Sequence, residues 1–147
     1  MKNRTTPDNI TELKDNEVFV FGSNLSGRHG RGAARTALKW GAKPGQARGL
    51  QGRTYGIPTK DKFIRRTLTI EEIEPFVIEF IEFAKQHQEL TFLTTEIGCG
   101  LAGYKPKDIA YLFEEAVNVP NIFLPLKFWK KIKRWDIYEK YINQNWN

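Results

Sequence analysis

The feature that most constrains the fold is a stretch over residues 17–41, where an apolar run is followed by a glycine-rich and then an alanine-rich segment. Val18–Phe21 does not alternate between polar and apolar residues, which is typical of a strand buried on both faces of a sheet. Four glycines follow: Gly22, Gly27, Gly30 and Gly32. Ala33–Trp40 is predicted to be a helix that ends at Gly41. Strand, glycine loop and helix in this order hold anions through backbone N–H groups, although an ordinary strand-to-helix connection has the same pattern.

The positive charge of the chain gathers in and after this glycine segment. The net charge is +6, yet residues 28–66 carry eleven Lys or Arg and a single acid, a net of +10. Residues 67–125 carry three bases and ten acids, a net of −7. This distribution favours a polyanionic ligand, either a nucleotide diphosphate or a nucleic acid. The alternative is a basic face that only solvates the protein.

Length and composition indicate one globular domain of 147 residues, 40% of them hydrophobic. No apolar run is long enough to span a membrane, and the polar N-terminus does not resemble a signal peptide, so we expect a cytoplasmic protein without a membrane partner. Cys99 is the one cysteine, and the two histidines lie far apart in the sequence. We therefore expect neither a disulfide framework nor a metal site.

The rest of the chain alternates between strand and helix patterns. Residues 1–16 are expected to be an edge or a loose lead-in, and Ala42–Gly52 a loop. The further elements predicted are a strand Arg53–Pro58 ended by its proline, a helix from a Thr69–Glu72 capping box with a kink or restart at Pro75, a strand Thr91–Ile97, a helix from Pro106 to about Val117, and a strand Asn121–Leu124. This order predicts an α/β fold with a mixed, mostly parallel sheet.

Helical periodicity identifies the side chains that should face the core. They are Ile73, Phe76, Val77, Phe80, Ile81 and Ala84 in the first long helix, and Ile109, Leu112, Phe113 and Ala116 in the second. Residues 126–147 combine lysines with aromatic residues and are predicted to form a C-terminal amphipathic helix packed on the body. A helix that contacts nucleic acid is the alternative.

A second glycine loop, Glu96–Tyr104, follows the predicted strand Thr91–Ile97. Ligands of open α/β sheets bind outside the carboxyl ends of the strands. Two glycine loops at that edge could therefore hold one diphosphate from both sides. The glycine spacing matches neither the dinucleotide-binding fingerprint nor the phosphate loop of nucleotide hydrolases.

Over roughly residues 17–125 the chain resembles the macrodomain family, whose members bind ADP-ribose. Phe21–Asn24 with Gly27–Ala34 resembles the family's first strand and glycine-rich loop, and Glu96–Tyr104 resembles its second phosphate loop. Tyr55–Lys60 is similar to the lysine-bearing segment of two branches, the DNA ADP-ribosyl glycohydrolase antitoxins and the terminal ADP-ribose protein glycohydrolases. The resemblance implies a single three-layer α/β/α domain over residues 1–147, with ADP-ribose as ligand or substrate, no cofactor, and ADP-ribosylated nucleic acid or protein as partner.

The resemblance also implies the site residues. Lys60 would attack the anomeric carbon of the distal ribose, and Glu96 and His29 are candidates for a general acid or base. The ligand-binding residues would be Gly22, Ser23, Asn24, Leu25, Gly27, Gly30, Gly32, Ala33, Thr59, Ile97, Gly98, Cys99, Gly100, Leu101, Ala102, Gly103 and Tyr104. Each of the three candidate catalytic residues has a structural alternative, which for Lys60 is a phosphate contact or solvation beside Asp61.

Two departures from the family pattern keep other functions open. Ala102 stands where the protein glycohydrolase branch has an acid, and the acid that commonly holds the adenine amino group has only Asp15 and Glu17 as candidates. A binding module that holds ADP-ribose or a related NAD-derived nucleotide without hydrolysing it is therefore an alternative to the hydrolase. A basic α/β domain that binds nucleic acid is a second one. Cys99 is expected to be a small residue that fits beside phosphate, because no histidine is spaced to activate it.

Overall fold

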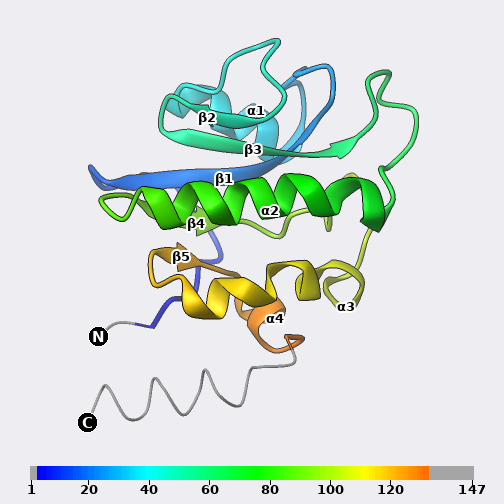
Figure 1. The fold of residues 1–147 in the computed structure, drawn as a ribbon. Coiled ribbons are helices and arrows are strands. Elements are labelled where there is room, and N and C mark those ends of the chain that lie inside the picture. The colour runs from blue at the N-terminus through cyan, green and yellow to red at the C-terminus, as the bar shows by residue number, and fades with distance from the viewer. Residues whose placement is uncertain (1–2, 133–147) are drawn as a thin grey trace, which may run out of the picture.

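The computed structural model describes residues 3–132, which form an α/β fold around a five-stranded sheet (Figure 1). The strands are β1 (Glu17–Asn24), β2 (Gly49–Gln51), β3 (Thr54–Lys60), β4 (Thr91–Thr94) and β5 (Ile122–Phe123). Their order is β2-β3-β1-β4-β5. Only β2 runs antiparallel to its neighbour, so the mixed, mostly parallel sheet that the sequence predicts is confirmed.

Within residues 3–132, four α-helices and two 3₁₀ segments connect and follow the strands. The α-helices are α1 (Gly32–Ala37), α2 (Ile70–Gln86), α3 (Pro106–Ile109) and α4 (Leu126–Trp129). The 3₁₀ segments are η1 (Leu38–Trp40) and η2 (Ala110–Asn118). The helix predicted from Pro106 to about Val117 is thus mostly 3₁₀, although its four predicted core residues are all buried.

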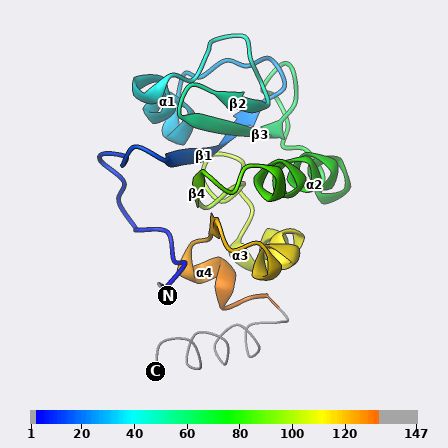
Figure 2. The ribbon, with the colours of Figure 1, turned by 60° about the vertical axis from the view of Figure 1, so that its left-hand side comes forward.

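The side chains of β1 alternate between two separate apolar clusters. Val18 and Val20 belong to the larger cluster, which contains the buried face of α2. Phe19 and Phe21 belong to a smaller one with Ala34 and the other small residues of α1. This explains why the strand is apolar throughout, because each face meets a different partner. Figure 2 shows α1 and α2 apart from each other, each next to the β1–β3 pair.

Two predicted features around β3 are wrong. The strand does not end at Pro58 but continues to Lys60 beside β1. Beyond Gly56 the side of β3 away from β1 is no longer covered by β2, and proline is tolerated at such an edge. The predicted loop Ala42–Gly52 also contains β2, which is only three residues long.

Helix α2 begins at the predicted cap. The Thr69 hydroxyl accepts from the Glu72 amide at 3.2 Å, and the Glu72 carboxylate accepts from the Thr69 amide at 2.9 Å. The helix does not restart at Pro75 but runs through it to Gln86, although the proline has no N–H to donate to the Glu71 carbonyl. Five of the six predicted core residues are buried, and the sixth, Phe76, packs against the cluster while partly exposed.

Strand β4 is shorter than predicted and ends at Thr94. The Thr95 hydroxyl then donates to the Val20 carbonyl at 2.7 Å, and the Ile97 amide turns back to the Thr95 carbonyl at 2.7 Å. These bonds redirect the chain away from the sheet, so Ile97 belongs to the loop that follows.

Both ends of the described chain pack against β5. The N-terminal segment is hydrogen-bonded to this edge of the sheet and to η2. The Thr6 amide donates to the Leu124 carbonyl, and the Arg4 guanidinium donates to carbonyls at the end of η2. Of the predicted C-terminal helix 126–147, the structure shows α4, which ends at Trp129 and is followed by a turn. Phe128, Trp129 and Ile132 are buried, and residues 133–147 lie outside the described part. None of the helices within residues 3–132 has the length and apolar character that crossing a membrane requires.

Candidate functional site

The two glycine loops meet at one edge of the sheet. They leave the carboxyl ends of β1 and β4, which are parallel neighbours. A Cβ placed on Gly22 would lie 3.8 Å from the Gly98 backbone nitrogen, and one on Gly32 would lie 3.6 Å from the Leu101 side chain. The residues predicted to hold one ligand from two sides therefore lie next to each other.

The first loop, residues 25–31, is held in shape by Asn24. Its side-chain amide donates to the Arg28 carbonyl at 2.7 Å, and its oxygen accepts from the Arg28 amide at 2.9 Å and from the Ser26 hydroxyl at 2.7 Å. The Asn24 side chain is buried. Asn24 thus acts on the loop, and any ligand contact would be made by the backbone that it positions.

The glycines of this loop differ in what surrounds them. Gly27 is buried at φ +71°, and a Cβ there would lie 2.4 Å from the carbonyl carbon of Gly45. Only glycine permits this close approach to the Pro44–Gly45 turn. Gly30 has open space instead, and its N–H has no hydrogen-bond acceptor among the described residues.

The second loop offers a row of unbonded amides. Gly98 is at φ +78° against Ile109, and the Tyr104 amide donates back to the Gly98 carbonyl at 2.8 Å. Between these residues the N–H groups of Gly100, Leu101 and Ala102 have no acceptor within residues 3–132. Successive free amides in a turn are the arrangement that binds phosphate oxygens.

A third segment, the hairpin 60–67, joins the same edge. Lys60 ends β3, its carbonyl accepts from the Leu25 amide at 3.0 Å, and a bridge pairs it with Thr67. The Thr67 hydroxyl donates to the Ala102 carbonyl at 2.6 Å, and the Tyr104 hydroxyl to the Leu68 carbonyl at 2.6 Å. The hairpin is therefore bonded to both glycine loops. The Tyr104 hydroxyl is engaged in the protein, and burial raises its pKa.

The Lys60 ammonium group has no carboxylate within 4.0 Å among the described residues. The neighbouring Asp61 carboxylate instead accepts from the backbone amides of Arg65 and Arg66, at 2.7 and 3.0 Å, and these bonds lower its pKa. Arg66 in turn pairs with Glu72. Lys60 is half-buried and remains available for a ligand.

The other two candidate catalytic residues lie in different surroundings. His29 is 4% exposed, packs edge-on against Phe21 and shares a 3.1 Å hydrogen bond with Gln51 Oε1. It anchors the first loop to β2. Glu96 is exposed beyond β4 and lines a cavity of about 280 Å³ together with Asp8, Phe19 and Ala33.

The acid expected to hold adenine is not where the sequence places it. Asp15 and Glu17 lie at the start of β1, at the opposite edge of the sheet, so they cannot reach a ligand at the glycine loops. Asp8 and Glu96 are the acids that line the smaller cavity. The sequence signal for Asp8 is weak, because a polar turn after Pro7 carries no distinctive spacing.

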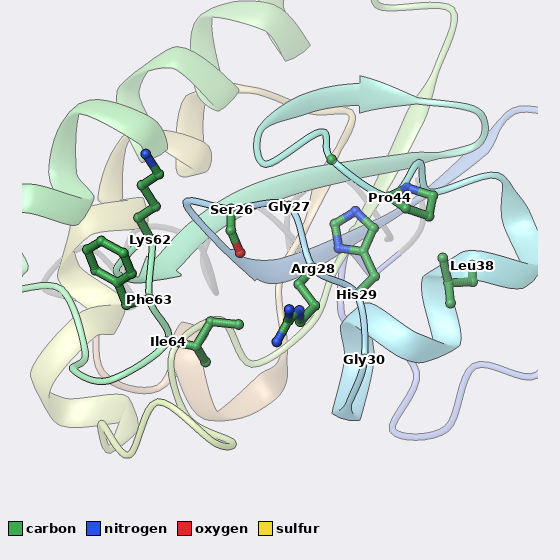
Figure 3. Close-up of a pocket in the computed structure, with 11 residues that line it drawn as sticks. Ser26, Gly27, Arg28, His29, Gly30, Leu38, Pro44, Lys62, Phe63 and Ile64 are labelled. Atoms are coloured by element: carbon green, nitrogen blue, oxygen red, sulfur yellow. The ribbon is translucent and has the colours of Figure 1, made fainter.

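A larger cavity, of about 620 Å³, lies along the other side of the first loop (Figure 3). Ser26–Gly30 lines it, and Lys62, Phe63 and Ile64 of the hairpin approach it from across the loop. The sequence does not predict this hairpin, because Pro58 indicates an early end to β3.

Two further groups bear on the chemistry. Burial, followed by the charges of Glu96 and Asp108, raises the pKa of the Cys99 thiol to about 11, so this thiol stays protonated at neutral pH. No group of three or more His, Cys, Asp or Glu side chains is placed to hold a metal ion within the part of the chain that the structure describes.

Comparison with known proteins adds no relative: no protein-family model, no curated protein and no solved structure matches the chain.

Proposed function

We propose that the chain is an ADP-ribose-binding domain of the macrodomain type that hydrolyses an ADP-ribosyl linkage on nucleic acid or protein. The observation that carries the proposal is that two glycine loops lie next to each other at the ends of β1 and β4, with Lys60 at the end of the adjoining strand β3. A diphosphate bound there can reach free amides of both loops, and a sugar beyond it can reach the lysine. Side chains of β1 contribute to two separate apolar clusters. These clusters support the three-layer arrangement expected of this family.

The surroundings suggest how ADP-ribose would lie. The diphosphate would span the N–H groups of Gly100–Ala102 and of Gly30. The adenosine would occupy the smaller cavity, where Asp8 or Glu96 can accept a hydrogen bond from the adenine amino group. The distal ribose would then lie on the β3 side of the first loop, near Lys60.

The reaction needs a neutral amine at Lys60. Its nitrogen attacks the anomeric carbon, the bond from that carbon to the acceptor breaks, and the acceptor leaves with a proton. Water then hydrolyses the resulting Schiff base with the opened sugar, which releases ADP-ribose and restores the lysine. Because Asp61 is bonded to backbone amides, it does not hold the lysine in an ion pair.

A second candidate function is a module that binds ADP-ribose without hydrolysing it. It is favoured by Ala102, whose carbonyl accepts the Thr67 hydroxyl at a position where the hydrolase pattern has an acid. A basic domain that binds nucleic acid through residues 28–66 is the third candidate, and it would require no nucleotide site.

The three candidates are separated by comparing Lys60→Ala with the unchanged protein. Both are titrated with ADP-ribose and then incubated with ADP-ribosylated DNA and, in parallel, with ADP-ribosylated protein. Lys60→Ala is expected to abolish release of ADP-ribose while its affinity for free ADP-ribose changes less than about tenfold, since the diphosphate contacts remain. Lys130→Ala, at an exposed lysine after α4, is the matched control.

Turnover that survives in Lys60→Ala contradicts the lysine mechanism. Binding without turnover in the unchanged protein identifies the non-catalytic module instead. Absence of ADP-ribose binding contradicts the proposal as a whole.

A further inference from the structure

Thr67 connects the end of β3 to the second glycine loop. It is paired with Lys60 in an isolated antiparallel bridge, and beside this pair the Leu68 amide donates to the Thr59 carbonyl at 2.8 Å. Paired residues of an antiparallel ladder project their side chains from the same face, with Cβ atoms about 5 Å apart. The Thr67 side chain therefore lies beside the lysine that the proposed reaction uses.

The Thr67 hydroxyl reaches the second glycine loop. It donates to the Ala102 carbonyl at 2.6 Å. The Gly103 amide, in the same peptide group as that carbonyl, donates to the Gly100 carbonyl at 3.1 Å and closes a turn over residues 100–103. Among residues 3–132, no other hydrogen bond joins this turn to another part of the chain. Thr67 is thus the hydrogen-bonded link that fixes where the turn lies relative to β3.

The turn carries the amides assigned to the diphosphate. The N–H groups of Gly100, Leu101 and Ala102 have no acceptor within the described part of the chain. The Leu101 side chain is 59% exposed, so its packing contributes little to holding the turn. The backbone of Lys60 is fixed independently, because β3 pairs with β1 up to this residue. One hydroxyl group therefore controls the spacing between two parts of the site.

We propose that Thr67 is a positioning residue, which sets the spacing between the diphosphate-binding amides of residues 100–102 and the amine of Lys60. The inference rests on the proposed function, because both groups must engage one ADP-ribose molecule. The rate of reaction at a bound sugar depends on placement, and a displacement of about 1 Å can slow it about a hundredfold. Loss of the hydroxyl should therefore affect the reaction of the lysine more than the affinity for the nucleotide.

The test traps the reaction of Lys60 with free ADP-ribose. The aldehyde of the opened distal ribose condenses with the Lys60 amine, and water leaves. The Schiff base then takes a proton and accepts hydride from added cyanoborohydride, which gives a stable secondary amine. Peptide mapping by mass spectrometry measures the rate of this labelling at saturating ADP-ribose, and the exposed Lys130 reports random labelling in the same samples. Calorimetric titration measures the affinity for ADP-ribose separately.

Three variants separate positioning from a general loss of stability. Thr67→Val keeps the branched shape without the hydroxyl and should slow labelling of Lys60 about ten- to a hundredfold, while the affinity for ADP-ribose falls less than about tenfold. Thr67→Ser keeps the hydroxyl and should stay within about threefold of the unchanged protein in both measurements. Thr54→Val is the matched control, because the Thr54 hydroxyl also donates to a backbone carbonyl at 2.6 Å, that of Gln51, but at the opposite end of β3. It should leave the labelling of Lys60 unchanged.

Equal labelling of Lys60 in Thr67→Val and in the unchanged protein overturns the inference. An equal loss in Thr67→Ser or in Thr54→Val overturns it as well. If the unchanged protein binds ADP-ribose and is labelled at Lys60 in those experiments, only the role of Thr67 fails. If the unchanged protein does not bind ADP-ribose, or binds it without labelling Lys60 faster than Lys130, the proposed function fails and the role of Thr67 fails with it.

Discussion

At the scale of single residues, the glycines of the two loops fall into two groups. Gly27 and Gly98 have positive φ and are packed so closely that a Cβ would lie 2.4 Å from Gly45 and 2.7 Å from Ile109, respectively. Gly30 and Gly100 have nothing within 4 Å of the position that a Cβ would take, and they do not have positive φ. The first group shapes the loops, and the second leaves backbone exposed where a ligand can approach.

This division predicts opposite effects for two alanine substitutions. Gly27→Ala should lower the free energy of unfolding by about 2–4 kcal/mol, because strain at positive φ adds to a backbone clash. Gly100→Ala should leave stability within about 0.5 kcal/mol, yet weaken ADP-ribose binding about tenfold by filling space at the diphosphate. Urea unfolding and calorimetric titration measure the two effects. Equal effects of both substitutions on stability would contradict the division.

Cys99 is predicted to be unreactive for an electrostatic reason. Burial and the nearby acids raise its pKa to about 11, above the ordinary value of 9.0, so at about pH 8 the thiolate fraction is about a hundredfold lower than for an unperturbed thiol. Alkylation by iodoacetamide, followed by mass spectrometry, should be slower by that factor than in the urea-unfolded chain. The rate should also keep rising as the pH passes the ordinary thiol pKa of 9.0. A rate equal to that of the unfolded chain would contradict this.

The sequence indicates which residue types form the site better than it indicates what each does. Lys60 and the two glycine loops can be placed because strand ends and glycines have local signals. The role of His29 depends on Gln51, twenty-two residues away, and on a strand too short to be recognised. Asp15 and Glu17, the acids considered from the sequence, lie at the other end of β1, and no local pattern links Asp8 to Glu96 in the smaller cavity.

At the scale of elements, the strands and helices with strong local signals are predicted well. The Thr69 capping box and the apolar face of α2 follow from periodicity. The errors lie where tertiary contacts override local preference. Strand β3 continues through Pro58 because it pairs with β1 on one side there, while the other side of the proline needs no partner. Strand β4 ends because the Thr95 hydroxyl donates to the Val20 carbonyl.

The ion pair that ties the hairpin to α2 predicts a pH dependence. The Arg66 guanidinium, at 2.8 Å, and the Thr69 amide lower the pKa of Glu72 to about 2, from an ordinary value of 4.5. The folded pKa is the lower one, so this stabilisation is fully present above the ordinary pKa and is lost as the pH falls toward 2.

Glu72→Gln should therefore be less stable than the unchanged protein at neutral pH, and the difference should vanish near pH 2. Urea unfolding across that range measures it. Glu74→Gln is the control, because Glu74 is exposed on the same helix and has no hydrogen-bonded partner among the described residues. A difference for Glu72→Gln that stays constant with pH would contradict the assignment.

At the scale of the whole molecule, the basic residues and the cavities lie at the same edge of the sheet. The basic segment 28–66 contains most of the first loop and the hairpin, which line the larger cavity, and the smaller cavity lies between α1 and the start of the second loop at Glu96. Asp8 and Glu96 give the smaller cavity an acidic character, whereas the larger one is basic. A ligand with a polar base at one end, a diphosphate in the middle and an anionic acceptor at the other end matches this distribution.

The central claim is that the two adjacent loops bind one ADP-ribose molecule through backbone amides. Calorimetric titration of ADP-ribose into the full chain, at about 0.1 and 0.5 M salt, tests it most directly, because hydrogen bonds to uncharged backbone amides depend less on salt than contacts between exposed charges do. The account predicts one molecule bound per chain, with a Kd in the range of about 1–100 μM that changes less than about threefold between the two salt concentrations. No heat of binding, or an affinity that collapses with salt as it does for a nucleic-acid-binding surface, would contradict it.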